Sequence, residues 1–328
     1  MSKVVILEPI FDDVSAEAKV LKEMGTELVQ SPSDDEDTVL RYAQGANALV
    51  SGHVKITDKV LGAAPNCKLV MQAGIGLDNV DVAAASRRGV FVANMPGYCT
   101  EEVVEHTLAL MLALQRKICL LDRNVKKGGW KKASWGKVGA DAEPIFRIKG
   151  QVLGLVGFGG IGRALSPKAA ALGYRVVAVD PFVDEEEMNR AGAQKTEFNE
   201  LLKLSDVVSI HAPLSKETHH LFNADTIGKM KMSAFLVNTS RGRLVDQKSL
   251  YKALKEGNIA GAALDVLEKE PPDDEALFGL DNVIITPHAG HYSEEVMGEL
   301  KAGVFRQIIA VLRGGHPEHW VNRNEMSR

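Results

Sequence analysis

The segment from Val152 to Asp180, VLGLVGFGGIGRALSPKAAALGYRVVAVD, constrains the fold of this chain more than any other stretch. It begins with a short apolar run, passes through a glycine-rich turn into a helical stretch, and ends in a second apolar run closed by an acid. Two parallel strands need a crossover connection, which is usually a helix. The order therefore predicts a strand, a helix and a parallel strand in an α/β sheet.

The turn in this segment carries three glycines, Gly157, Gly159 and Gly162, in the pattern G-x-G-x-x-G. The first permits a tight turn, the second lets the backbone approach a pyrophosphate, and the third lets the helix pack closely on the strand. The helix that follows offers free N–H groups to phosphates. Asp180 can accept hydrogen bonds from an adenosine ribose. We therefore predict a dinucleotide site, although a glycine turn alone would indicate only a strand–helix connection. The predicted cofactor contacts in this turn are Gly157, Gly159, Gly160, Ile161 and Gly162.

Composition narrows the class of protein. The chain has 328 residues, which suits two domains better than one core. Its net charge of −4 gives no global attraction to nucleic acid or to an anionic membrane. The three cysteines are widely spaced and form neither a disulfide framework nor a C-x-x-C metal site, so we expect a reducing cytoplasm and no metal. The N-terminal MSKVVILEPIF is expected to be a first strand rather than a signal peptide.

Short apolar runs recur on both sides of the glycine turn and alternate with polar helical stretches. This rhythm predicts a doubly wound parallel sheet, whose ligands bind at the carboxyl ends of the strands. Because the glycine turn lies in the middle of the chain, a nucleotide domain beginning near residue 101 must be flanked by another α/β domain or inserted into it. Thr100 is predicted to be the N-cap of a buried helix. The predicted runs are 4–7, 48–52, 68–74, 90–97, 207–213, 234–240, 259–266 and 282–288.

Three residues that follow predicted strands could perform chemistry. Arg241, in NTSRG, could clamp a carboxylate through two hydrogen bonds, or it could satisfy backbone carbonyls as a structural arginine. Glu270 lies in LEKEPP and His288 in TPHAG. A carboxylate bonded to an imidazole fixes its tautomer, and the protonated ring can serve as a general acid. A lone histidine after a strand is more often structural, but the three residues together favour a catalytic site.

Four motifs taken together, GFGGIGRA, VNTSRGRLVD, AALDVLEKEPP and ITPHAGHYS, resemble the D-isomer-specific 2-hydroxyacid dehydrogenases. The resemblance covers nearly the whole chain. It implies a Rossmann NAD-binding domain, residues 101–289, inserted into a flavodoxin-like substrate domain made of residues 1–100 and 290–328. It also implies a homodimer. The segments LSKETHHLFN and YSE look closest to the branch that contains C-terminal-binding-protein corepressors and their bacterial enzyme relatives.

The resemblance assigns roles to individual residues. Arg241 orients the substrate, His288 donates a proton to the carbonyl oxygen, and Glu270 pairs with His288. The backbone of Ile75 and Gly76 resembles the donors that receive the substrate carboxylate, as exposed N–H groups of such a turn can bind an anion. Asp265 looks like the residue that holds the nicotinamide carboxamide. The remaining predicted cofactor contacts are Thr100, Asp180, His211, Ala212, Pro213, Thr218, Asn238, Thr239, Ser240 and Gly290.

The sequence departs from the family pattern at the predicted substrate site. Many phosphoglycerate-type members have an Arg-Ser pair and a further arginine where this chain has Ser51-Gly52-His53 and Gln72. Two cations suited to a phosphate are therefore absent, which lowers the expectation of a phosphorylated substrate. His53 could contact a polar substrate tail or lie in an exposed loop. His291 replaces a tryptophan of the corepressor pattern and is expected near the mouth of the site.

The function expected from these features is reversible hydride transfer between NADH and a small 2-oxo acid, giving a D-2-hydroxy acid. Asp180 favours NAD over NADP, because a 2′-phosphate beside a carboxylate is repelled. The alternative is an NAD(H)-sensing binding protein of the corepressor type with weak or vestigial catalysis. A basic loop with two tryptophans, residues 126–137, could suggest nucleic-acid binding, but we expect a solvated connector with Trp130 and Trp135 as anchors.

Overall fold

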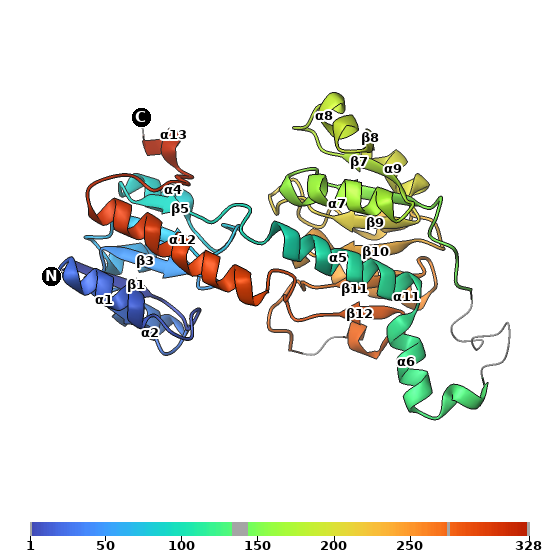
Figure 1. The fold of residues 1–328 in the computed structure, drawn as a ribbon, viewed down its shortest axis with the longest axis horizontal. Helices are drawn as coiled ribbons and strands as arrows, with labels where there is room; N and C mark the ends of the chain where they lie inside the picture. The colour runs from blue at the N-terminus through green and yellow to red at the C-terminus, as the bar shows by residue number, and fades with distance from the viewer. Residues whose placement is uncertain (1, 133–143, 274–275, 327–328) are drawn as a thin grey trace. The chain divides into compact units, whose positions relative to one another are not determined.

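The computed structural model describes residues 2–132, 144–273 and 276–326 (Figure 1). It divides into two compact units, of which the first joins Met1–Tyr98 to Ser293–Arg328 and the second is Cys99–Tyr292. The first unit is therefore made from both ends of the chain. Trp135 lies outside the described residues. Among the described helices, none has the length and apolar character that crossing a bilayer requires.

The first unit contains a five-stranded parallel sheet with the order β2-β1-β3-β4-β5. This is the flavodoxin-like order, in which the chain reverses its direction of winding between β1 and β3. The strands are β1 (Ser2–Ile6), β2 (Thr26–Gln30), β3 (Ala48–Ser51), β4 (Leu69–Gln72) and β5 (Phe91–Ala93). The helices are α1 (Ser15–Glu23), α2 (Glu36–Ala43), α3 (Asp58–Ala63), α4 (Val82–Arg87), α12 (Glu294–Leu312) and α13 (Arg323–Met326).

Alternate residues of each strand in this sheet enter two different cores, because successive side chains point to opposite faces. In β1, Val5 packs with residues from α2 to α4, whereas Val4 and Ile6 pack on the face that α12 covers. The C-terminal segment is also tied to β5. Asn322 accepts a hydrogen bond from the N–H of Val92 at 2.9 Å and donates one to the carbonyl of Val90 at 2.9 Å.

The second unit contains a seven-stranded parallel sheet with the order β12-β11-β10-β9-β6-β7-β8. Its direction of winding reverses between β6 and β9, as in a dinucleotide-binding sheet. The strands are β6 (Val152–Val156), β7 (Arg175–Val179), β8 (Ala193–Lys195), β9 (Val207–Ile210), β10 (Phe235–Asn238), β11 (Gly261–Leu264) and β12 (Val283–Ile285). The prediction of two doubly wound parallel sheets is confirmed.

Helices cover both faces of the second sheet (Figure 1). The α-helices are α5 (Thr100–Gln115), α6 (Ile118–Lys126), α7 (Gly160–Ala171), α8 (Glu185–Arg190), α9 (Phe198–Leu204), α10 (Ala224–Ile227) and α11 (Gln247–Lys255). The short 3₁₀ helices are η1 (Gly129–Lys132), η3 (Gly242–Leu244) and η4 (Ala276–Gly279). The predicted N-cap of α5 was wrong by one residue. Cys99 is the cap, because its carbonyl already accepts the Val103 N–H, and Thr100 is the first helical residue.

Candidate active site

The glycine turn lies where the sheet of the second unit changes direction. Gly157 has φ +96°, a conformation that side chains rarely adopt, and a Cβ there would lie 2.5 Å from the Ala212 nitrogen. A Cβ on Gly162 would lie 2.6 Å from the Gly157 oxygen, so the third glycine lets α7 approach the turn. A Cβ on Gly159 would meet no atom within 4 Å. The first and third glycines therefore serve the fold, whereas the second leaves open space for a ligand.

The start of α7 fits a dinucleotide phosphate. Gly159 is its N-cap and makes no side-chain cap, and the first N–H groups of a helix, here those of Gly160 to Gly162, have no partner within it. The carboxylate of Asp180 accepts the N–H of Phe158 at 2.8 Å and that of Phe182 at 2.9 Å. Asp180 therefore lies beside the glycine turn with its charge fixed in place. These residues fit the predicted NAD.

Polar groups that follow the neighbouring strands β9 and β10 are hydrogen-bonded to one another. The Ser240 hydroxyl donates to the Ala212 carbonyl at 2.7 Å, and Thr218 donates to the Pro213 carbonyl at 2.7 Å. Asn238 accepts the Ser240 N–H, and the hydroxyls of Thr239 and Thr107 lie 2.9 Å apart.

His211 also follows β9, but its ring is buried in the interior of the unit. Its Nε2 lies 2.9 Å from the Ser209 hydroxyl, and burial lowers its pKa to about 4. Its Nδ1 is buried and, among the described residues, has no hydrogen-bond partner. His211 is therefore neutral, and any contribution that it makes to cofactor binding comes from the shape of its ring rather than from its charge.

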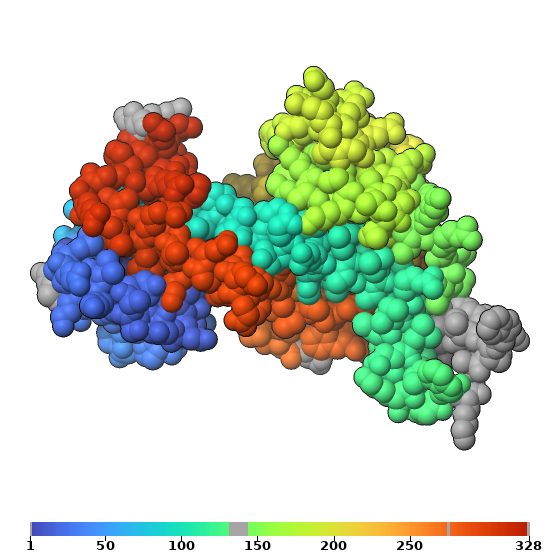
Figure 2. Space-filling model, viewed as in Figure 1, coloured from blue at the N-terminus to red at the C-terminus, as the bar shows by residue number. Residues whose placement is uncertain are grey.

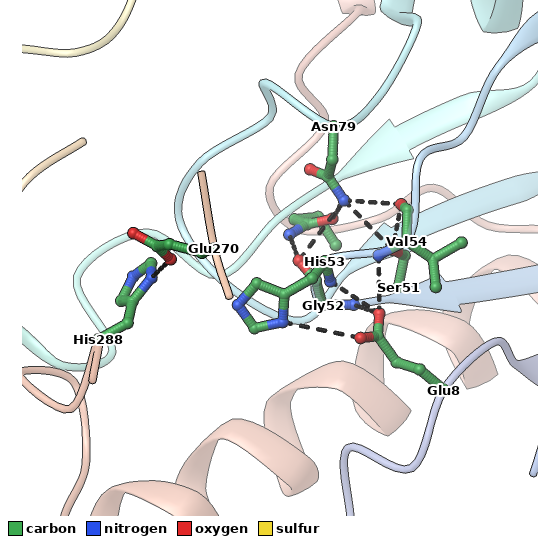
Figure 3. Close-up of polar contacts among 9 residues, drawn as sticks. Glu8, Ser51, Gly52, His53, Val54, Asn79, Glu270 and His288 are labelled. Carbon is green, nitrogen blue, oxygen red and sulfur yellow. Dashed lines mark hydrogen bonds and ion pairs between the residues drawn. The ribbon is translucent and has the colours of Figure 1, made fainter. Parts of the chain in front are cut away.

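His288 and Glu270 form a close pair, with the histidine Nδ1 2.7 Å from Oε2 of the glutamate (Figure 3). The other carboxylate oxygen accepts the N–H of Leu267 at 2.8 Å, which fixes the carboxylate in its own loop. An ionised carboxylate only accepts, so Nδ1 carries the proton and Nε2 faces away from the pair. The His288 side chain is 31% exposed, and the His291 ring lies edge-on to it at 6.0 Å between centroids. The pair is thus oriented and accessible.

Asp265 holds the turn that carries His288. Its carboxylate accepts hydrogen bonds from the Thr286 hydroxyl at 2.6 Å and from the N–H groups of Ala289 and Gly290, each at 2.9 Å. Burial alone would raise its pKa, but side-chain bonds from His106 and Thr286 and these backbone bonds outweigh burial and lower the pKa to about 2. A Cβ on Gly290 would lie 2.8 Å from the Asp265 carboxylate. The structure therefore gives Asp265 a positioning role, and contact with the nicotinamide stays a prediction.

Arg241 is brought to the Glu270 loop by its neighbour Gly242. A Cβ on Gly242 would lie 1.9 Å from the carbonyl atoms of Leu267, so the two backbones touch at a position that only glycine allows. The Asn238 side chain donates to the Arg241 carbonyl at 2.9 Å, and the Arg241 guanidinium donates to the Ser240 carbonyl at 2.8 Å. The second unit therefore gathers Arg241, Glu270 and His288 around one set of strand ends.

The predicted substrate residues Ile75 and Gly76 follow β4 in the first unit. The Asn94 side chain donates to the Ile75 carbonyl at 2.7 Å, and the Met95 N–H donates to the Gly74 carbonyl at 2.9 Å. Among the described residues, the N–H groups of Gly74, Ile75 and Gly76 donate to no protein acceptor. The carbonyls of the turn are therefore hydrogen-bonded, and binding of an anion by its N–H groups stays a prediction.

His53 follows β3 and lies beside a carboxylate that the sequence analysis did not single out. Its Nδ1 is 3.7 Å from Oε2 of Glu8, and its side chain is 74% exposed. The other Glu8 oxygen accepts three successive backbone N–H groups, from Gly52, His53 and Val54 (Figure 3). Glu8, Gly242, Thr286 and His106 are therefore contributors that sequence reasoning missed. Of these four, only Glu8 could have been found from the sequence, because it is an acid directly after the apolar run 4–7.

The described part of the chain holds no group of three or more His, Cys, Asp or Glu side chains arranged for a metal ion.

Residues 108–290 match the family model described as D-isomer specific 2-hydroxyacid dehydrogenase, NAD binding domain. A glyoxylate reductase of Korarchaeum cryptofilum is 40% identical over 287 residues, which are 87% of this chain and 85% of that protein.

Two further proteins match almost the whole chain. A D-3-phosphoglycerate dehydrogenase of Methanocaldococcus jannaschii is 36% identical over 323 residues, which are 98% of this chain and 60% of that protein. The crystal structure of a D-lactate dehydrogenase from Aquifex aeolicus, complexed with NAD and lactic acid, has a TM-score of 0.85 at 28% identity. The match covers 95% of this chain and 96% of the Aquifex aeolicus chain.

Proposed function

The chain belongs to the D-isomer specific 2-hydroxyacid dehydrogenase family, and from this membership we propose that it reduces a small 2-oxo acid to a D-2-hydroxy acid with NADH, and catalyses the reverse reaction. NAD is the cofactor of its second unit. The observation that carries the catalytic assignment is the His288–Glu270 pair, joined at 2.7 Å in the unit that carries the glycine turn. The predicted binding-protein alternative gains no support from the relatives described above.

The mechanism assigns one task to each residue of the set. Bound NADH supplies the hydride. Arg241 stabilises the negative charge that develops on the carbonyl oxygen, because a guanidinium cannot lose its proton and binds oxyanions strongly. His288 delivers the proton of Nε2 to the same oxygen, and Glu270 holds the ring in the tautomer and orientation this requires. In the oxidative direction, neutral His288 accepts that proton.

The first unit supplies the substrate contacts in this proposal. The N–H groups of Ile75 and Gly76 receive the substrate carboxylate, and His53 contacts the rest of the acid. His291, which belongs to the second unit, contacts the acid as well. Support comes from the free N–H groups of the 74–76 turn and from its place at the carboxyl end of β4, where ligands of parallel sheets bind.

Steady-state oxidation of NADH with a panel of 2-oxo acids tests the proposal. We expect turnover with at least one small acid, and binding of NADH in a fluorescence titration. Tight binding of NADH without turnover of any acid would favour the binding-protein alternative. Tighter binding of NADPH than of NADH would contradict the role given to Asp180, whose carboxylate is fixed beside the glycine turn.

We also propose a cytoplasmic homodimer without a nucleic-acid partner. Helix α6 supports the dimer, because no described residue in it is buried and it stands away from the sheet of its own unit (Figures 1 and 2). Ile118, Val125 and Trp130 are exposed apolar residues on or next to this helix. Sedimentation analysis of the wild type and of an Ile118→Glu/Val125→Glu variant tests this, with a dimer expected only for the wild type. A monomeric wild type would overturn it.

A further inference from the structure

The most unusual group in the first unit is the Glu8 carboxylate. Glu8 follows β1 and the loop Gly52–Val54 follows β3, and these two strands flank the point where the sheet changes its direction of winding. Sheets of this order bind ligands in the crevice at that point. The part of the first unit best suited by topology to receive a ligand is therefore bridged by a side chain of the protein itself.

The Glu8 carboxylate occupies a site with the geometry of an anion-binding site. Successive N–H groups that converge on one point form an anion-binding concavity, and here those of Gly52, His53 and Val54 converge on one Glu8 oxygen at 2.7, 2.7 and 3.0 Å. Burial alone would raise the pKa of Glu8, but the His53 side chain and the three backbone donors lower it to about 2. Glu8 is therefore ionised at physiological pH.

Two carbonyls of the same loop, those of Gly52 and Val54, also accept hydrogen bonds from within the unit. Gln72 donates to the Gly52 carbonyl at 2.6 Å. Asn79 donates to the Val54 carbonyl at 3.0 Å (Figure 3). Asn79 also bonds Oε1 of Gln72 at 3.1 Å. Two neutral amides thus fix the loop on one side, while Glu8 contributes a full negative charge on the other.

The 74–76 turn, which follows β4, lies next to this loop in the sheet, because β3 pairs with β4. Neighbouring strands are about 4.8 Å apart, so the end of β1 is about 10 Å from the end of β4. A 2-oxo acid whose carboxylate binds at the 74–76 turn therefore brings the far end of a three- or four-carbon tail toward Glu8.

We infer that Glu8 determines the charge of the substrate tail, so that the preferred substrate is a short 2-oxo acid whose only anionic group is its own carboxylate. This inference rests on the proposed function and names its substrate class. A phosphorylated or dicarboxylic acid would place a second negative charge beside the fixed charge of Glu8, and the backbone donors that could have bound that charge are already occupied. Like charges brought together in this way oppose binding.

The test compares hydroxypyruvate with its 3-phosphate in the wild type, in Glu8→Gln and in Glu36→Gln. The glutamine of Glu8→Gln keeps an oxygen that can accept the three N–H bonds while its charge is lost. We expect the kcat/KM of the wild type to be at least about tenfold higher for hydroxypyruvate than for the 3-phosphate. In Glu8→Gln this ratio of the two kcat/KM values should fall about tenfold, because the Coulomb repulsion between two charges several ångströms apart is removed. Glu36→Gln removes an equal charge from the exposed first residue of helix α2, where Glu36 pairs with Lys59, and should leave the ratio unchanged.

Each result decides the inference. A wild-type preference for the phosphorylated acid would overturn it without any variant, which covers the case in which Glu8→Gln does not fold. Turnover of hydroxypyruvate with the same ratio in the wild type and Glu8→Gln would overturn the inference and leave the proposed function intact. Failure of the wild type to reduce any 2-oxo acid would overturn the proposed function, and this inference with it.

Discussion

Each unit of this protein pairs a histidine with a glutamate at the carboxyl end of a parallel sheet, but the two pairs are built for different tasks. In the second unit, Nδ1 of His288 lies 2.7 Å from Glu270. In the first unit, Nδ1 of His53 lies 3.7 Å from Glu8, whose other oxygen binds three backbone N–H groups. One glutamate orients a histidine, whereas the other mainly orients a loop. A histidine next to a carboxylate is therefore not by itself a catalytic pair.

His288→Ala should have the largest effect of any change to these pairs. Loss of a general acid lowers rates by about 10²- to 10⁴-fold. We expect a fall of this size in kcat, with little change in the dissociation constant of NADH, because the glycine turn and Asp180 are untouched. Steady-state kinetics and a fluorescence titration measure the two quantities. Near-normal turnover would show that His288 is not the catalytic acid. The His288–Glu270 pair would then no longer differ in function from the His53–Glu8 pair.

Glu8→Gln should change stability in a way that depends on pH. The pKa of folded Glu8, about 2, lies below the ordinary value of 4.5, so its charge stabilises the fold above about pH 4.5 and this contribution is lost as the pH falls toward 2. The shift corresponds to about 3 kcal/mol at neutral pH. Urea unfolding should therefore show a gap between wild type and variant at pH 7 that shrinks in acid. A gap independent of pH would mean that the charge of Glu8 does not support the loop.

Gly242→Ala tests how the second unit brings Arg241 to the Glu270 loop. The new Cβ would collide with the Leu267 carbonyl, at 1.9 Å in the present backbone. Overpacking of this kind costs about 1–3 kcal/mol of stability, and displacement of the loop should lower kcat/KM by about tenfold or more. Thermal unfolding and steady-state kinetics measure both effects. Gly279→Ala is the matched control, because a Cβ there meets no atom within 4 Å. Equal effects of the two substitutions would contradict the assigned role.

His53→Ala should have the smallest effect. Its side chain is 74% exposed, and its Nδ1 lies 3.7 Å from Oε2 of Glu8, which is longer than a hydrogen bond. Exposed ion pairs contribute less than about 1 kcal/mol to stability. We expect KM for the 2-oxo acid to rise by no more than about fivefold, with kcat unchanged. A loss of kcat as large as that of His288→Ala would show that the first unit also supplies a catalytic acid.

The sequence was sufficient to predict the parts of the fold that local patterns determine. Continuous apolar runs such as those of β6 and β9 predict buried parallel strands, and the glycine spacing predicts the turn between β6 and α7. The edge strands β2 and β8 were not predicted, because TELVQ and AQK contain no continuous apolar run and are only partly buried. A strand at the edge of a sheet pairs on one side only and needs less apolar surface.

The parts of the site that depend on contacts distant in sequence could not be predicted in this way. Glu8 meets a loop more than forty residues away, and nothing in the sequence near either segment indicates that contact. The oxygens of Asp265 bind the turn at Thr286 to Gly290, a positioning role that its place in the sequence did not indicate. Family resemblance paired Glu270 with His288, whereas the hydrogen-bond partners of Glu8 and Asp265 are visible only in the structure.

The most direct test of the proposed reaction follows the hydride itself. The wild-type protein would be incubated with hydroxypyruvate and NADH dideuterated at C4, and the product analysed by mass spectrometry and chiral chromatography. We predict glycerate of the D configuration that carries one deuterium at C2, formed in step with the oxidation of NADH. The L product, a product without deuterium at C2, or the absence of any product while NADH binds tightly would contradict the account.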